Sequence, residues 1–286
     1  MRRQSSNVKE HQLSSNKALH YFLFVPSQGA KNASVMVTVH GISRNARKHA
    51  RRFARHAERH GVVVVAPLFD VQHYPGYQRL GISGERADLA LNQILTEVAE
   101  RTQANTQKLY MFGYSGGAQF VHRYAMAYPN RVAAIAVGAA GWYTLPDPSQ
   151  RFPHGTAPHH KLPDLSFDAS QFLRIPTYTL VGALDTLRDD ALRQTPRLDQ
   201  QQGHTRFERG ERWVKIMKQA SRKYGLNTEF RFISLPKADH SFTRSIKAGG
   251  MAERVFACLF GSPPLTAKTH PPHCMGLRLN TTVNFS

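Results

Sequence analysis

Residues 110–119 read YMFGYSGGAQ, a short apolar run followed by one serine among glycines. The apolar run ends at Gly113, Ser115 follows two residues later, and the next residues have the composition of a helix. A strand that turns sharply into a helix forces the residue at the turn into a strained conformation, so its neighbours two positions away must lack side chains. The stretch therefore predicts a strand, a tight turn that exposes the Ser115 hydroxyl, and a helix.

Apolar runs and helical patterns alternate on both sides of this stretch. The apolar runs are residues 34–41, 62–69, 133–143, 175–185 and 229–236. The helical patterns cover residues 44–61, 85–102, 116–128, 208–225 and about 245–260. Runs without polar alternation are typical of strands buried on both faces, and strands that alternate with helices favour a mostly parallel sheet. We predict one doubly wound α/β domain over residues 1–286, with ligands bound beyond the carboxyl ends of the strands.

Three segments fall outside the alternation. Residues 1–17 are expected to form a polar leader, and residues 262–286 a loosely packed C-terminal tail. Residues 144–173 are rich in proline and histidine and lie between two predicted strands. We therefore expect a loop insert on the cleft side of the sheet, in the position of a lid.

Composition narrows the class of protein. The 286 residues are 41% hydrophobic, which is enough for one sizeable core. No run approaches the roughly 18 apolar residues of a membrane span, and the early run YFLFVP is too short for a secretory signal and lacks a cleavage site. Two cysteines, Cys258 and Cys274, do not make a disulfide framework. The sequence predicts a cytoplasmic protein and specifies no oligomeric state.

The net charge of +19 is unusually high. Such a surface favours an anionic partner or substrate by long-range attraction. The densest basic run, residues 44–55, is typical of the solvated face of a helix. No zinc-finger spacing or RNA-binding aromatic motif accompanies it, so a non-catalytic protein that binds nucleic acid or anionic membrane is kept as an alternative.

A serine hydroxyl is a weak nucleophile unless a histidine accepts its proton and a carboxylate orients that histidine. Where a G-x-S-x-G turn between a strand and a helix carries the serine, the three residues follow the order serine, acid, histidine. Asp185 ends the predicted strand over residues 175–185, and His240 follows the last predicted strand. We predict Ser115, Asp185 and His240 as a catalytic triad, with Asp189 and Asp190 as the alternative acids.

The tetrahedral intermediate of acyl transfer also needs hydrogen-bond donors for its oxyanion. One predicted donor is the N–H of Gly116, the residue after the nucleophile. The other comes from the loop after residues 34–41, where the chain reads VHGIS. We predict Ile42 for this donor, with Gly41 as the alternative, and expect His40 to brace the loop.

These motifs together resemble the α/β-hydrolases over about residues 33–261. The resemblance rests on VHG, GYSGG, VGALD and ADH, in that order along the chain. APLFD, YQRLG and AGWYTLPD are in addition similar to bacterial esterases and polyhydroxyalkanoate depolymerase-like hydrolases. The resemblance implies an α/β-hydrolase fold and serine-based hydrolysis of an ester without a cofactor.

Aromatic residues near the predicted strand ends are candidates for substrate binding. Tyr114, Trp142 and Tyr77 are expected either to line a substrate pocket or to pack the rim of the cleft. The histidines of the insert have no nearby pair of carboxylates, so no metal site is predicted. We expect a serine hydrolase that cleaves a small or polymeric carboxylic ester, with a peptidase or thioesterase on the same triad as the alternative.

Overall fold

The computed structural model describes residues 7–261, and the expected C-terminal tail with Cys274 lies outside them. Within the described residues, eight strands form one sheet. The strands are β1 (Lys9–Leu13), β2 (Asn16–Phe24), β3 (Ser34–Val39), β4 (Val63–Leu68), β5 (Asn105–Tyr114), β6 (Val132–Gly138), β7 (Thr177–Gly182) and β8 (Phe230–Leu235). The α-helices are α1 (Ala46–His60), α2 (Ala87–Thr102), α3 (Gly116–Ala127), α4 (Ala169–Phe172), α5 (Pro196–Gln202), α6 (Arg206–Lys223), α7 (Phe242–Lys247) and α8 (Met251–Phe260). Two short 3₁₀ helices, η1 (Tyr77–Arg79) and η2 (Pro129–Arg131), complete the set.

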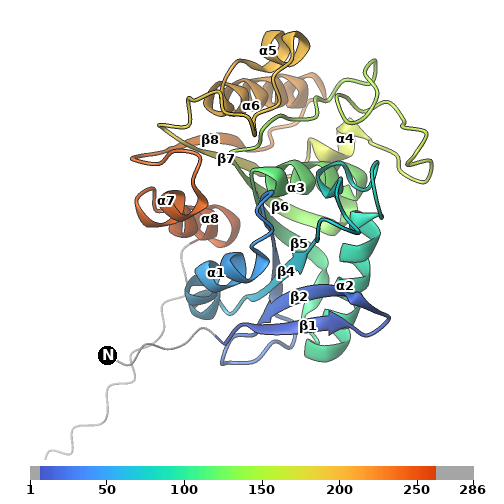
Figure 1. Cartoon of the computed structure of the whole chain (residues 1–286), viewed down its shortest axis with the longest axis vertical. Helices are drawn as coiled ribbons and strands as arrows, with labels where there is room; N and C mark the ends of the chain where they lie inside the picture. Colours follow the sequence, from blue (N-terminus) through green and yellow to red (C-terminus); the bar gives the residue numbers. More distant parts are fainter. Residues whose placement is uncertain (1–6, 262–286) are drawn as a thin grey trace, which may run out of the picture.

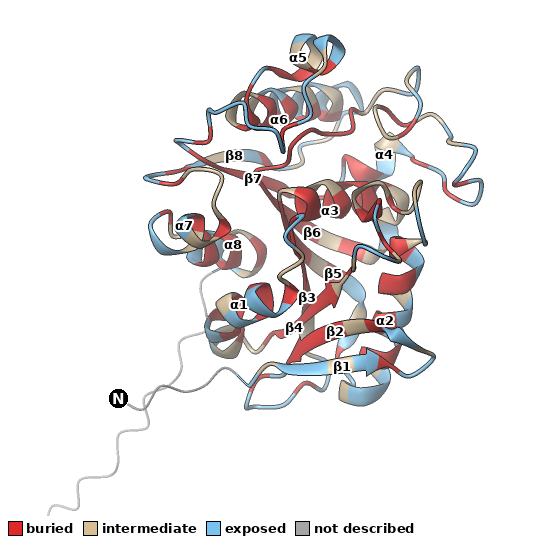
Figure 2. Ribbon diagram, viewed as in Figure 1, coloured by how far each residue is buried: buried red, intermediate tan, exposed pale blue. Residues whose placement is uncertain are grey.

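The strand order is β1-β2-β4-β3-β5-β6-β7-β8 (Figure 1). All pairs from β4 to β8 are parallel, whereas β1 and β2 pair antiparallel at one edge. The predicted mostly parallel sheet is confirmed. Its central strands are almost wholly buried, which explains their runs of apolar residues without alternation (Figure 2).

Helices cover both faces of the sheet. α1 and α8 pack on one face, against a core that includes Phe53, Phe112 and Phe256. α2, α3 and α6 pack on the other, against a core that includes Leu91, Phe120 and Trp213 (Figure 1). The doubly wound arrangement directs the loops after β3, β4, β5, β7 and β8 to the carboxyl edge of the sheet, where the predicted site residues lie.

The expected polar leader is partly wrong, because β1 and the start of β2 lie within residues 1–17. β1 is an edge strand with several exposed residues, so its sequence shows little apolar signal. Tyr21 of β2 is buried and donates a hydrogen bond to Glu97 of α2, which joins the edge to the body of the sheet.

The last predicted helix is also corrected, because it is two helices. α7 ends before Gly249 and Gly250, and Gly250 has a φ of 60°. A left-handed residue interrupts helical hydrogen bonding. His240 immediately precedes α7, so this break lies close to the predicted site.

The insert over residues 144–173 is a loop apart from α4, and it packs on the body of the protein. Thr144 at its start accepts a hydrogen bond from Arg123 of α3 at its side chain and from Trp213 of α6 at its carbonyl oxygen. Phe152 and Phe167 are buried and stack with ring centroids 4.2 Å apart. No helix in the described part of the chain is long and apolar enough to cross a membrane.

Candidate active site

Ser115 occupies the junction between β5 and α3 with a strained backbone. Its φ is 54° and its ψ is −114°, a combination that costs free energy for a residue with a side chain. Its N–H donates to Gly138 O at 2.7 Å, which fixes the junction to β6. The Ser115 hydroxyl does not cap α3, so it remains directed toward other groups.

The two flanking glycines are required by sterics. A Cβ on Gly113 would lie 2.1 Å from Gly117 O, and a Cβ on Gly117 would lie 2.1 Å from Val39 O. Both contacts are to backbone atoms, which cannot move aside as a flexible side chain can. The glycines thus allow α3 to start directly against β3 and β5.

Three segments far apart in the sequence bring together Ser115, His240 and Asp185. His240 Nε2 lies 3.1 Å from Ser115 Oγ, and His240 Nδ1 lies 2.8 Å from Asp185 Oδ2. The Asp185 side chain is 1% exposed and that of His240 is 21% exposed. Nδ1–H therefore donates to the carboxylate and Nε2 is left to accept the serine proton, the tautomer that a nucleophilic serine needs.

The two alternative acids lie elsewhere. Asp189 accepts two hydrogen bonds from Arg206, at 2.9 and 2.6 Å, and its side chain is 43% exposed. These hydrogen bonds lower the pKa of Asp189 below its usual value. Asp190 is exposed. Of the three candidates, Asp185 alone contacts His240 among the described residues.

The loop after β3 passes close to Ser115. A Cβ on Gly41 would lie 3.4 Å from Ser115 Cβ and 4.0 Å from Ser115 Oγ. Within the described residues, no hydrogen bond is made by the N–H of Ile42 or by that of Gly116. Gly116 is the first residue of α3, where the helix dipole places partial positive charge. The predicted donors thus lie in backbone segments next to the serine.

His40 connects this loop to the end of β4. Its Nδ1–H donates to Gly41 O at 2.8 Å, and its Nε2 accepts from Phe69 N at 3.0 Å. Complete burial is the main cause that lowers the pKa of His40 to about 4, so the ring is neutral near pH 7. The Tyr77 hydroxyl donates to His40 O at 2.9 Å. These contacts are those expected of a residue that braces the loop.

The three aromatic candidates are all packed inside the protein. Tyr77 is 0%, Trp142 4% and Tyr114 5% exposed. The Tyr114 ring stacks on His240 with centroids 5.6 Å apart, and burial is the main cause that raises its pKa. Trp142 lies under the guanidinium group of Arg123, 4.1 Å from the ring centroid. Of the two expected arrangements, the structure has the packed one.

Several residues near the site carry no signal in the sequence. Arg206 is 1% exposed and lies beside Asp185, yet a basic residue at the start of a charged helix is typical of a surface. Exposed apolar side chains also follow the strand ends, namely Ile42 after β3, Val71 after β4, and Leu184 and Leu187 after β7. The only sequence signal for these four apolar residues is their position just after predicted strands. Among the described residues, no group of three or more candidate ligands could hold a metal ion.

Comparisons with known proteins agree on the fold. No protein-family model matches the sequence, and no curated protein matches it. The structure is similar to that of poly(aspartic acid) hydrolase-1 from Sphingomonas sp. KT-1, with a TM-score of 0.70, 22% identity, and coverage of 84% of this chain and 93% of that one. It is equally similar to a poly(3-hydroxybutyrate) depolymerase from Bordetella parapertussis, with a TM-score of 0.70, 23% identity and coverage of 90% of both chains.

A third similar structure is an S-formylglutathione hydrolase from Agrobacterium tumefaciens. Its TM-score is 0.57 at 15% identity, with coverage of 88% of this chain and 94% of that one. Each alignment spans most of both chains. Together with the strand order and the helices that connect the parallel strands, these similarities show that the chain has the α/β-hydrolase fold.

Proposed function

We propose that the chain is a serine hydrolase that cleaves a carboxylic ester through an acyl-enzyme. The row of hydrogen bonds from Ser115 through His240 to Asp185 supports this function more than any other observation. The strained φ of Ser115 adds to it, because strain at a non-glycine residue persists only where the surrounding structure enforces it. A protein that only binds polyanions has no need of this arrangement.

In the first half of the proposed reaction, Ser115 Oγ attacks the acyl carbon while His240 Nε2 takes its proton. Asp185 stabilises the imidazolium that forms. The carbonyl oxygen becomes an oxyanion, which accepts hydrogen bonds from the N–H groups of Gly116 and Ile42. The C–O bond to the alcohol then breaks, and the leaving alkoxide takes the proton from His240. The product of this half is an acyl-Ser115 ester and a free alcohol.

In the second half, a water molecule attacks the acyl-Ser115 ester. His240 Nε2 accepts one proton of that water, and the same N–H groups hold the second oxyanion. When the bond to Ser115 Oγ breaks, His240 returns the proton to the serine. The free carboxylic acid leaves and the enzyme is restored.

Labelling with a fluorophosphonate, which reacts covalently with activated serines, tests this proposal. We expect wild-type protein to be labelled at Ser115, as located by peptide mapping, and Ser115→Ala to be unlabelled. Ser166→Ala, which removes an exposed serine of the insert, is the matched control and should label normally. A folded wild-type protein that takes no label, or takes it at another serine, contradicts the proposal.

The names of the structurally similar proteins include hydrolases of polymers and of a small thioester, so the proposed substrate is an ester of either size. The same triad serves amides and thioesters. Comparing turnover of 4-nitrophenyl acyl esters, acyl thioesters and peptide 4-nitroanilides separates these classes. Faster cleavage of the nitroanilides would assign a peptidase. A cytoplasmic location belongs to the same proposal, and fractionation of cells that express the full chain tests it.

A further inference from the structure

We propose that the substrate carries a negatively charged group that binds to Arg79 and Arg193, and that the charge of the buried Arg123, about two turns of α3 beyond Ser115, attracts the same group. We call these three arginines the arginine subsite. The inference rests on the proposed hydrolase function and adds a substrate class to it. The charged group is a carboxylate or a phosphate, since both present oxygen atoms that match a planar guanidinium.

Arg123 is the centre of the subsite and is completely buried. Its Nε donates to Thr144 Oγ1 at 3.0 Å, and its Nη1 donates to Gln78 O at 2.7 Å and to Gln119 Oε1 at 3.2 Å. Its Nη2 is buried and has no hydrogen-bond partner among the described residues. A buried charge that no carboxylate balances is costly, and an unsatisfied donor adds to that cost.

Two further arginines converge on the same place. The guanidinium carbon of Arg193 lies 5.5 Å from the centroid of the Trp142 ring, and that of Arg123 lies 4.1 Å from the same centroid. Arg79 directly follows Gln78, whose carbonyl oxygen accepts the hydrogen bond from Arg123. Burial first, and then the charge of Arg193, lower the pKa of Arg79 below its usual value. Three like charges thus share one site, which raises its free energy until an anion binds.

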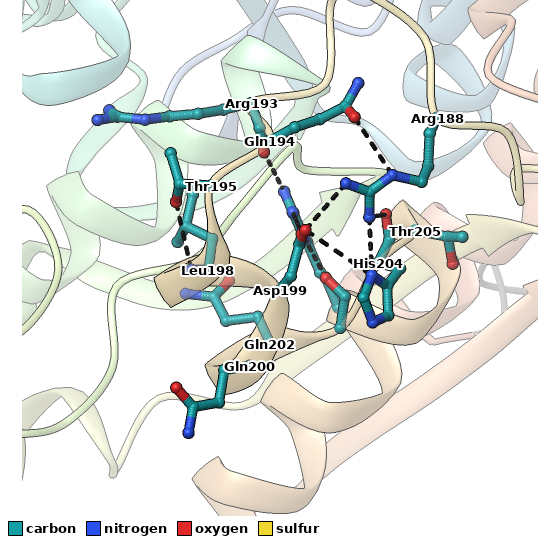
Figure 3. Close-up of polar contacts among 12 residues, drawn as sticks. Arg188, Arg193, Gln194, Thr195, Leu198, Asp199, Gln200, Gln202, His204 and Thr205 are labelled. Atoms are coloured by element: carbon teal, nitrogen blue, oxygen red, sulfur yellow. Dashed lines mark hydrogen bonds and ion pairs between the residues drawn. The ribbon is translucent and has the colours of Figure 1, made fainter.

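None of the three arginines forms an ion pair with a described carboxylate. The hydrogen bond from Arg79 goes to the neutral Ser83 Oγ, at 3.2 Å. Figure 3 shows the Arg193 side chain extending away from the network that joins Arg188, Asp199 and His204. By contrast, Arg206 and Arg209, which are as deeply buried as Arg123, are paired with aspartates.

The insert completes the surroundings of the subsite. The ring of His154 lies 4.9 Å from that of Trp142, and its buried Nδ1 has no described hydrogen-bond partner. Burial first, and then the charges of Arg197, Arg193 and Arg123, lower the pKa of His154 to about 4. A neutral imidazole beside the arginines offers a further donor to an anion.

The subsite lies within reach of a substrate bound at Ser115. Arg123 is eight residues beyond Ser115, so their Cα atoms are about 12 Å apart along the axis of α3. Gln119 lies one turn before Arg123 and donates its N–H to Ser115 O. The Gln78 side chain passes over the start of the helix, since a Cβ on Gly116 would lie 3.2 Å from Gln78 Cγ. Two amide side chains therefore lie between the serine and the arginines, and an extended substrate arm would cross them.

The experiment compares pairs of substrates that differ only in charge. The anionic members are mono-4-nitrophenyl esters of linear dicarboxylic acids of increasing length. In the neutral members, the remaining free carboxylate of the same compound is converted to a methyl ester. For at least one length, we expect kcat/KM to be at least about tenfold higher for the anionic ester. A third series carries a terminal phosphate in place of the carboxylate. The series with the higher kcat/KM identifies which of the two anionic groups the subsite binds.

The test variant is the double substitution Arg79→Gln and Arg193→Gln, which retains the buried Arg123. We expect the ratio of anionic to neutral kcat/KM to fall about tenfold, through KM of the anionic ester. Arg51→Gln with Arg55→Gln makes the same change in net charge on the exposed face of α1 and should keep the wild-type ratio. An equal fall in both double variants would mean that long-range attraction alone acts, which would overturn the subsite.

Binding to Ser115→Ala protein separates the subsite from the catalytic proposal. By calorimetry, we expect the methyl monoester of a dicarboxylic acid to bind, its neutral diester to bind at least about tenfold more weakly, and the difference to vanish in the triple variant with Arg79→Gln and Arg193→Gln. Binding without fluorophosphonate labelling or turnover would leave the subsite in place and refute the hydrolase. Labelling and turnover, together with equal affinity for the monoester and the diester, would support the hydrolase and refute the subsite.

Discussion

The guanidinium group of Arg206 lies 3.5 Å from Asp185 Oδ1, and both side chains are 1% exposed. Its two terminal nitrogens also bind the carboxylate of Asp189. Asp185 Oδ1 has no hydrogen-bond partner among the described residues, so His240 at Oδ2 and the nearby Arg206 are what offset the burial of its charge. Arg206 therefore lies between two aspartates with different roles in the structure: it binds Asp189 directly, whereas Asp185 contacts His240.

Substituting each aspartate in turn tests which one acts on His240. Asp185→Asn should lower kcat for a 4-nitrophenyl ester by about 10³–10⁴-fold, because the amide no longer favours the required histidine tautomer. Asp189→Asn is the matched control and should lower kcat by less than about tenfold, because Asp189 contacts Arg206 and not His240. If Asp189→Asn loses as much activity as Asp185→Asn, the assignment of the acid is wrong.

Removing Arg206 should destabilise the protein more than removing an exposed arginine. Arg206→Met leaves Asp185 buried with less compensation, so we expect the free energy of unfolding to fall by about 3–5 kcal/mol in urea titrations. Arg244→Met breaks the partly exposed ion pair with Asp239 and should cost no more than about 1 kcal/mol.

A double variant checks the cause of this loss. In protein that already carries Asp185→Asn, the buried charge is absent, so Arg206→Met should cost less than it does in the wild type. Equal costs in the two backgrounds would mean that Arg206 stabilises the fold by packing or through Asp189 rather than by compensating Asp185.

The central strands and the Ser115 turn could be predicted because their signals are local. The apolar run of β4 is set by burial on both faces, and the glycines at 113 and 117 are set by clashes within a few residues. β1 could not be predicted, since an edge strand with polar, exposed residues gains its order from pairing with β2.

The surroundings of the site were less predictable. Tyr114 and Trp142 follow strand ends, but the sequence does not tell whether such side chains face a cleft or pack beneath it. Arg123 and Arg206 are charged residues of helices, which are usually exposed. Segments distant in sequence bury them here: the Gln78 turn and Thr144 contact Arg123, and the loop after β7 contacts Arg206. Burial of charge by distant segments is a tertiary property that a local pattern does not record.

The close approach of α3 to β3 makes a strong prediction for Gly117. In Gly117→Ala, the new Cβ would lie 2.1 Å from Val39 O and 2.5 Å from His40 O, so either α3 or the loop that contains His40 must move. We expect the free energy of unfolding to fall by about 3 kcal/mol or more, or the protein to fail to fold. Thermal or urea unfolding measures this change.

Gly141→Ala is the matched control for that substitution. A Cβ on Gly141 would meet the end of the flexible Gln119 side chain at 3.3 Å and no backbone atom, so we expect a loss below about 1 kcal/mol. Similar losses at the two positions would show that the strand-to-helix junction tolerates a side chain, against the steric explanation of the glycines.

Buried neutral histidines predict that stability falls in mild acid. Burial lowers the pKa of His40 to about 4 and those of His49 and His122 well below their usual value. Unfolded histidines bind a proton near pH 6.5, so at lower pH the unfolded state binds more protons than the native state. The contribution of these histidines to the free energy of unfolding is therefore complete above about pH 6.5, and it decreases as the pH falls toward their native-state pKa values. Urea titrations at about pH 7.5 and about pH 5 should show this decrease.

His49→Phe isolates one contribution to the decrease. His49 stacks on Phe242 with ring centroids 3.9 Å apart and an interplanar angle of 5°, so phenylalanine keeps the aromatic contact and removes the proton site. Whatever the substitution costs at neutral pH, the decrease between about pH 7.5 and about pH 5 should be smaller than in the wild type by about 2 kcal/mol. His160→Phe removes an exposed histidine of the insert and should retain the wild-type decrease. An unchanged pH dependence in His49→Phe would show that His49 gains its proton equally in the native and unfolded states.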